Sequence, residues 1–248
     1  MIKTQSKKLS ENVNQHAQKN LESQKQDVEI LKVILDVKKS LEQKYSLSID
    51  FNSKIYCSDI EKIVSDNIES REDTYIKPDG GFLSIKLNDK DCFILVSEQK
   101  RQGTNDARLS EGKSAQAKGN AVERLGKNVD AFDVIFSDED IYPFVVFLQG
   151  CDFYKEESTI VDRVRTIAKF QPFNTINLYW KKINKRLFAG GSFFMRGHSM
   201  HELLKAKIEG RDPILSDWKY DEMYSVMYQI ADESMQYYLD KYNKKNPD

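Results

Sequence analysis

The feature of this sequence that most constrains its fold is an apolar run, PFVVFLQG, which extends from Pro143 to Gly150. A strand with one solvated face alternates apolar and polar residues, whereas a strand buried on both faces reads as a nearly unbroken apolar run. Proline and glycine are typical residues at the ends of a strand. The run therefore predicts an interior strand, and an interior strand requires a sheet that is covered on both faces.

Two more β-like runs precede the interior strand, FLSIKL from Phe82 to Leu87 and CFILVSE from Cys92 to Glu98. The four polar residues from Asn88 to Asp91 join them. A short polar link between two such runs is typical of a β-hairpin. We therefore predict that these two strands pair with each other.

Three segments have the apolar spacing of amphipathic helices and can cover the sheet. They are residues 25–45, the segment from Asn120 (as N-cap) to Ile135, and residues 220–243. Shorter elements are predicted as a helix at 59–68, opened by a capping box of Ser58 and Glu61, a helix at 158–169 and a strand at 174–180. Residues 101–119 have no periodicity and predict a long loop.

The predicted fold class is α/β, with a mixed central β-sheet flanked by helices on both faces. A chain of 248 residues can form this fold as one domain spanning residues 1–248. Within it we expect an N-terminal helical arm at 1–50, a core at 70–155, and helices with a strand at 156–248. No apolar run approaches the roughly 20 residues of a membrane span. We therefore expect no membrane partner, and we expect the protein to be located in the cytoplasm.

Charge is unevenly distributed along a chain whose formal net charge is only −1. The segment from Lys100 to Lys127 contains seven basic and three acidic residues. The segment from Arg163 to Arg186 contains seven basic residues and no acidic one, with four aromatic residues among them. Such segments indicate binding to a polyanion, and ordinary solvated faces are the alternative.

Two short motifs could form a metal site. Asp79, in YIKPDGG, comes just before the first strand of the hairpin, while Glu98 and Lys100, in VSEQK, end the second strand. Strand residues two apart point to the same face, so hairpin pairing can bring the three side chains together. Two carboxylates suit Mg²⁺, which takes few protein ligands and keeps several waters. The pattern is weak alone, because charged residues at strand ends are commonly just solvated.

Four segments in order, YIKPDGG, VSEQKRQG, KGNAVER and YPFVVFLQGCDF, resemble the type II restriction endonucleases of the EcoRI/MunI (MfeI-like) family, in the PD-(D/E)XK nuclease superfamily. The resemblance implies Mg²⁺-dependent double-strand cleavage of a palindromic DNA site with an AATT core, leaving 5′-phosphate ends. It also implies a homodimer, a bacterial cytoplasmic location, and a host methyltransferase that protects the same site. A noncatalytic DNA-binding protein on a nuclease scaffold and a repair nuclease are the alternatives.

The resemblance assigns roles to individual residues. Asp79, Glu98 and Lys100 match the catalytic trio. Asp79 and Glu98 are the metal ligands, with the backbone carbonyl of Gln99 beside the metal. In this arrangement Lys100 would hold the attacking water and offset charge on the phosphate.

The predicted DNA contacts centre on KGNAVER. Asn120, Ala121 and Arg124 match the segment that reads AATT, and Glu123 would orient Arg124 or its symmetry mate. Asparagine and arginine offer bidentate hydrogen bonds to base edges in the major groove. The remaining expected contacts are Arg101, Lys118, Gly119 and Arg163. A plain helix start with a capping box is the alternative for this segment.

Lys118 bears on the outer base pair of the site. Family members that read CAATTG carry arginine at this position and those that read GAATTC carry alanine, so CAATTG is the first expectation and GAATTC the second. Lysine can donate to guanine O6 and N7, although a phosphate contact is an alternative role.

Overall fold

The structure of the chain is a computed structural model. The structure describes residues 28–56, 75–101, 120–136, 139, 141–149, 179–183, 186–190, 193–196, 206–211 and 218–245.

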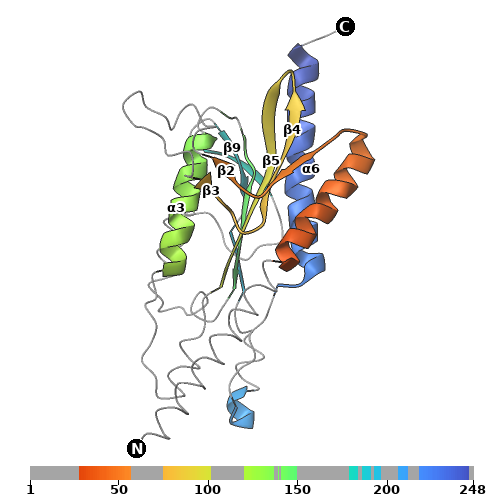
Figure 1. Ribbon diagram of the computed structural model, residues 1–248. Helices are drawn as coiled ribbons and strands as arrows, with labels where there is room; N and C mark the ends of the chain where they lie inside the picture. Colours follow the sequence, from red (N-terminus) through yellow and green to blue (C-terminus); the bar gives the residue numbers. More distant parts are fainter. Residues whose placement is uncertain are drawn as a thin grey trace, which may run out of the picture.

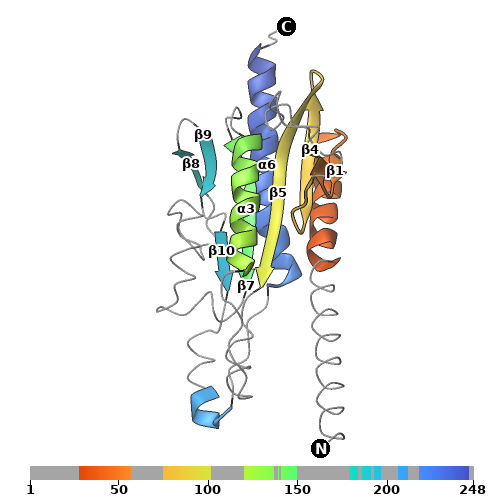
Figure 2. The same cartoon turned by 60° about the vertical axis from the view of Figure 1, so that its left-hand side comes forward.

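A five-stranded sheet forms the centre of the molecule, with strand order β1-β4-β5-β7-β10 (Figures 1 and 2). Its strands are β1 (Asp50–Asn52), β4 (Gly81–Leu87), β5 (Lys90–Arg101), β7 (Phe144–Gln149) and β10 (Phe193–Arg196). The pairs β1–β4 and β4–β5 are antiparallel, and the pairs β5–β7 and β7–β10 are parallel. The predicted mixed sheet is therefore confirmed.

Strand β7 is the interior strand that the apolar run predicts. All six of its residues are buried, and it pairs with β5 on one side and β10 on the other. Parallel neighbours need a crossover connection, and between β5 and β7 the chain passes through helix α3 (Asn120–Ile135). That crossover places α3 against the sheet.

The hairpin between β4 and β5 is confirmed, with a tighter link than the four residues expected. Lys90 already pairs with Leu87, so only Asn88 and Asp89 form the turn. Both have positive φ, 48° and 62°, as a two-residue hairpin turn of the favoured hand requires. Asparagine and aspartate tolerate this conformation better than most residues. Because the turn takes only these two residues, the polar residues Lys90 and Asp91 belong to β5 and pair with β4.

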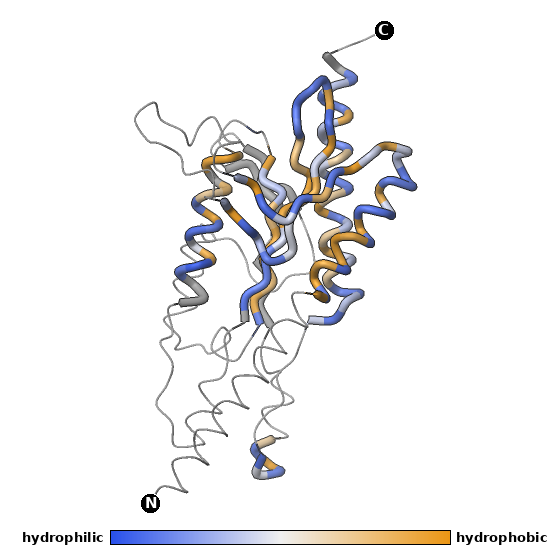
Figure 3. The backbone as a smooth tube through the Cα atoms, viewed as in Figure 1, coloured by the Kyte–Doolittle hydropathy of each residue, from blue (hydrophilic) through white to orange (hydrophobic). Residues whose placement is uncertain are grey.

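Helices cover both faces of the sheet, as predicted (Figure 1). On one face, α3 packs through Leu125 and Phe132 against Phe144 and Val146. On the other face lie the helix described from residue 28 to 45 and α6 (Tyr220–Lys245). Figure 3 shows hydrophobic and hydrophilic residues alternating along α3 and the 28–45 helix, which agrees with their amphipathic sequences.

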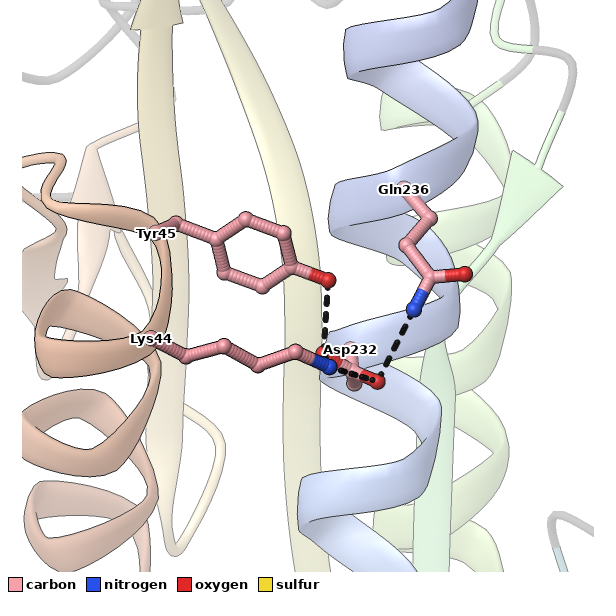
Figure 4. A network of polar contacts seen from close by, with 4 residues as sticks. All are labelled: Lys44, Tyr45, Asp232 and Gln236. Carbon is pink, nitrogen blue, oxygen red and sulfur yellow. Dashed lines mark hydrogen bonds and ion pairs between the residues drawn. The ribbon is translucent and has the colours of Figure 1, made fainter.

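Polar contacts join the 28–45 helix to α6, and Asp232 of α6 makes several of them. Asp232 accepts hydrogen bonds from Lys44 Nζ at 2.7 Å, from Tyr45 Oη at 2.7 Å and from Gln236 Nε2 at 3.0 Å (Figure 4). Further along the same pair of helices, Tyr220 donates to Asp36 at 2.5 Å. These contacts hold the 28–45 helix in place.

Several short strands were not predicted. Strands β2 (Ile55–Tyr56) and β3 (Tyr75–Ile76) form a two-stranded sheet, while β6 (Ile141–Tyr142), β9 (Arg186–Gly190) and β8 (Tyr179–Ile183) form a three-stranded one. Residues 179 and 180 of the strand predicted at 174–180 are the first two residues of β8, which continues to Ile183, and residues 174–178 lie outside the described part of the chain. The two-residue strands β2, β3 and β6 contain too few residues to show a period.

Other expectations meet the structure only in part. Arg101 was assigned to the long loop but ends β5, where its pairing with Gln149 continues the ladder. The rest of that loop and the helices predicted at 59–68 and 158–169 lie outside the described residues. Within the described part of the chain, no helix is long and apolar enough to cross a membrane.

Candidate active site

Strand β5 continues past the point where its antiparallel neighbour begins (Figure 2). The last pair with β4 joins Gly81 to Ser97, whereas pairing with β7 runs on to Arg101. Within the five-stranded sheet, the end of β5 that carries Glu98 and Lys100 thus has a strand on one side only. The chain segment just before β4 lies at the open side.

That segment, Pro78 to Gly81, turns tightly against β5. Gly81 N donates to Pro78 O at 3.1 Å, and Gly80 N donates to Ser97 O at 3.1 Å. Gly81 has a φ of +76°, a conformation that favours glycine. A Cβ placed on Gly80 would lie 2.0 Å from Ser97 Oγ. The two glycines therefore allow the turn that brings Asp79 to the end of β5.

The structure brings the predicted trio together. Lys100 Nζ lies 2.6 Å from Asp79 Oδ2 and 2.5 Å from Glu98 Oε1. The backbone N of Asp79 donates to Glu98 Oε2 at 2.9 Å. The side chain of Glu98 is fully buried, that of Lys100 is 14% exposed and that of Asp79 is 31% exposed. Of the three side chains, that of Asp79 is therefore the most accessible to solvent.

A fourth residue, Asn128 of α3, completes the surroundings of Glu98. Its Nδ2 donates to Glu98 Oε1 at 2.9 Å. The sequence interpretation missed this residue, although a signal was present. Asn128 lies three residues after Leu125 and four before Phe132, two buried residues of the same helix. A polar residue at that spacing faces the sheet edge rather than open solvent.

Electrostatics in the cluster follow from burial and from the opposite charges. Burial raises the pKa of Glu98, and the adjacent ammonium of Lys100 only partly offsets that rise. Burial acts to lower the pKa of Lys100, yet Glu98 and Asp79 together raise it above its ordinary value. Lys100 is therefore held as a cation between two acidic groups.

The donor set fits Mg²⁺. Two carboxylates approach one cationic atom, Lys100 Nζ, within hydrogen-bond distance, so a positive charge between them is already favoured. Among the described residues there is no group of three or more His, Cys, Asp and Glu side chains that could hold a metal. Mg²⁺ needs only one or two carboxylates, because it keeps several waters and takes phosphate oxygens. Gln99 lies between Glu98 and Lys100 on β5, so its side chain points to the opposite face of the sheet. The expectation for Gln99 accordingly concerns its backbone carbonyl and not its side chain.

The predicted DNA-reading residues that the structure describes are in α3 and at the end of β5. Helix α3 begins at Asn120, followed by Ala121, and Glu123 and Arg124, near its start, are exposed to solvent. Arg101 is the last residue of β5. The other three predicted contacts, Lys118, Gly119 and Arg163, lie outside the described residues.

Comparison with known proteins gives one family match and two curated relatives. A family model described as restriction endonuclease EcoRI matches residues 14–245. The type II restriction enzyme RsrI of Cereibacter sphaeroides is 37% identical over 94 residues, and the type II restriction enzyme EcoRI of Escherichia coli is 33% identical over 94 residues. Each alignment covers 34% of this chain and 34% of the relative, so the chain spans about a third of the length of the curated relatives it matches.

Proposed function

This chain belongs to the EcoRI family of restriction endonucleases, and we propose that it is a type II restriction endonuclease that cuts both strands of a palindromic DNA site with Mg²⁺ as its cofactor. The observation that carries the proposal is the contact of Lys100 with both Asp79 and Glu98. Asp79 comes from a turn and the other two from a strand end, and the backbone of Asp79 also hydrogen-bonds to the carboxylate of Glu98.

The protein's own residues divide the chemistry between them. Asp79 and Glu98 would hold the metal, with the carbonyl of Gln99 as a third ligand. When bound, Mg²⁺ supplies a Lewis acid for the scissile phosphate and lowers the pKa of a water. Lys100 would hold the attacking water with its ammonium group and offset the charge that develops on the phosphate. Cleavage would leave 5′-phosphate ends.

Preorganisation supports this assignment for Glu98. Its carboxylate is buried and accepts hydrogen bonds from Asn128 Nδ2 and from the backbone of Asp79. A ligand fixed in this way need not reorganise during the reaction, and such preorganisation is a major source of rate enhancement. A solvated ion pair at a strand end would not bury one carboxylate fully.

Recognition is assigned to the start of α3. Asn120, Ala121 and Arg124 would read AATT from the major groove, and Glu123 would orient Arg124. Arg124 is exposed, as a base-reading residue must be in the DNA-free protein. Lys118 would read the outer guanine, which gives CAATTG, with GAATTC as the alternative. Gly119, Arg101 and Arg163 are the remaining proposed contacts.

A palindromic DNA site has twofold symmetry, which a protein of two identical subunits related by a twofold axis matches. We therefore expect a homodimer in which each subunit reads one half-site and cuts one strand. A methyltransferase of the same specificity is expected in the host, because the host's own sites need protection.

The experiment is digestion of long DNA with Mg²⁺, followed by sequencing of the ends. The expected product ends share an AATT core flanked by C and G. Flanking G and C would assign the chain to the GAATTC readers, whereas ends without AATT would refute the recognition assignment. Specific binding without any cleavage would favour a noncatalytic DNA-binding protein.

The metal ligands are tested by Asp79→Asn and Glu98→Gln. Each should abolish cleavage and leave DNA binding largely intact. In the wild-type protein, Ca²⁺, which is less demanding in geometry than Mg²⁺, should support specific DNA binding without efficient cleavage. The matched control is Asp91→Asn, which makes the same change at an exposed residue of β5. Near wild-type cleavage by either site variant would refute the metal site.

A further inference from the structure

We propose that Asn128 is a positioning residue through which the DNA-reading helix α3 sets the orientation of the Glu98 carboxylate. The inference rests on the proposed function and adds to it a physical link between recognition and catalysis.

The link is the hydrogen bond from Asn128 Nδ2 to Glu98 Oε1, at 2.9 Å. The other carboxylate oxygen, Oε2, accepts from the backbone N of Asp79 at 2.9 Å. Lys100 Nζ, also on β5, contacts Oε1 at 2.5 Å. Donors from a helix, a turn and a strand therefore surround one buried carboxylate, and the contact from Asn128 comes from across the space between helix and sheet.

The position of Asn128 along α3 connects it to the reading residues. It follows Arg124 by four residues, so both side chains lie on adjoining parts of the same helix face, about 6 Å apart along the axis. Leu125, Val129 and Phe132 pack the helix against the sheet and are nearly or fully buried. A helix held in this way moves as a unit, so a displacement at Arg124 would be transmitted to Asn128.

The chemistry of the amide suits a positioning role. A neutral donor favours the ionised carboxylate without adding a positive charge that would compete with a cation. Metal-ligating carboxylates are commonly held by such outer hydrogen-bond partners, and loss of one partner typically costs about 10–100-fold in metal affinity or activity. When Arg124 meets the correct bases, Asn128 would hold Glu98 in its productive orientation. A wrong base pair would displace the helix and weaken that contact.

The test compares Asn128→Leu, which removes the donor at similar volume, with Asn128→Gln, which keeps an amide. The matched control is Asp130→Leu, which places the same side chain at an exposed position of the same helix. Four quantities are measured: the urea midpoint, DNA affinity without metal, the Ca²⁺ affinity of the protein–DNA complex, and the single-turnover cleavage rate in Mg²⁺.

For Asn128→Leu we expect Ca²⁺ affinity and cleavage rate to fall about 10–100-fold, while DNA affinity without metal stays within about twofold, since no DNA contact is removed. The cleavage rate at the correct DNA site should fall more than the rate at sites with one altered base pair. The ratio of these two rates should therefore be smaller for Asn128→Leu than for the wild-type protein. Asn128→Gln should recover part of both losses, and Asp130→Leu should change none of the four quantities.

Unchanged Ca²⁺ affinity and cleavage in Asn128→Leu would overturn the inference. An equal loss of DNA affinity, or a lowered urea midpoint shared with Asn128→Gln, would also overturn it, because either result marks a structural role. If the wild-type protein does not cut DNA at all, the proposed function fails instead. The Ca²⁺ titration then still decides whether Asn128 positions Glu98.

Discussion

Replacing Gly80 by alanine should damage the active site more than it damages the fold. A Cβ at this position would meet Ser97 Oγ at 2.0 Å and Ile30 Cγ1 at 3.0 Å. Real Cβ atoms essentially never approach another heavy atom within 3.0 Å, so either the Ser97 side chain must rotate or the turn and β5 must separate by about 1 Å. Ser97 is completely buried, which leaves its side chain little room to rotate away.

The magnitude follows from where the displacement occurs. Inserting a methyl group into a packed site typically costs about 1–3 kcal/mol of stability. Gly80 adjoins Asp79, whose backbone N hydrogen-bonds to Glu98 at 2.9 Å, so the separation acts directly on the two carboxylates. A displacement of about 1 Å in a catalytic geometry can cost about 100-fold in rate. We therefore expect a folded protein with about 1% of wild-type cleavage.

The assay combines urea unfolding with single-turnover cleavage at saturating DNA. Gly210→Ala is the control, since its φ of +63° makes alanine strained while nothing lies within 4 Å of the added Cβ. It should lower stability by about 1–2 kcal/mol and leave cleavage unchanged. This control separates a loss of stability from a loss of catalytic geometry.

A double variant tests the cause. Among the described residues, Ser97 Oγ has no hydrogen-bond partner, so Ser97→Ala alone should cost little. Ser97→Ala removes the atom nearest to the methyl group that Gly80→Ala adds. The double variant should therefore cleave DNA faster than Gly80→Ala alone. Wild-type cleavage by the single variant, or no recovery in the double variant, would refute the steric argument.

Two further predictions concern stability. Phe132→Ala should lower the free energy of unfolding by about 3–5 kcal/mol, because this fully buried ring packs against Phe136 and Phe144 between α3 and the sheet; a loss below about 1 kcal/mol in urea unfolding would contradict that packing. The hydrogen bond to Asp36 raises the pKa of Tyr220 to about 12, above its unfolded value of about 10. The stabilisation that this hydrogen bond provides is therefore complete at pH values below the pKa of Tyr220 in the unfolded chain. It is lost as the pH rises through the pKa of Tyr220 in the folded protein. The difference in unfolding free energy between wild type and Tyr220→Phe should be constant up to about pH 10 and shrink above it; a difference that instead grew there would refute the assignment.

Local sequence patterns were sufficient for the main elements. The apolar run identified β7 as interior because a strand buried on both faces has no polar side. Apolar spacing located α3 and α6, whose buried sides face the core. The two-residue spacing of Glu98 and Lys100 placed both on one face of β5, and the structure has both on the side that contacts α3 or the turn.

Family resemblance supplied what spacing could not. Hairpin pairing alone could bring Asp79, Glu98 and Lys100 together, but charged residues at strand ends are commonly just solvated, and the resemblance is what gave the three residues catalytic roles. The DNA-reading roles of Asn120, Ala121 and Arg124 remain predictions, because they concern contacts with a molecule outside the protein.

The sequence by itself determined which segments become strands or helices and which side of each is buried, since both properties depend on residues a few positions apart. Only the tertiary structure decided what each buried side meets. Asn128 and Glu98 are thirty residues apart, and their hydrogen bond exists because α3 packs across β5. The closeness of Gly80 to Ser97 likewise depends on how the turn before β4 lies on β5. Such contacts depend on distances in space, and a local period carries no information about them.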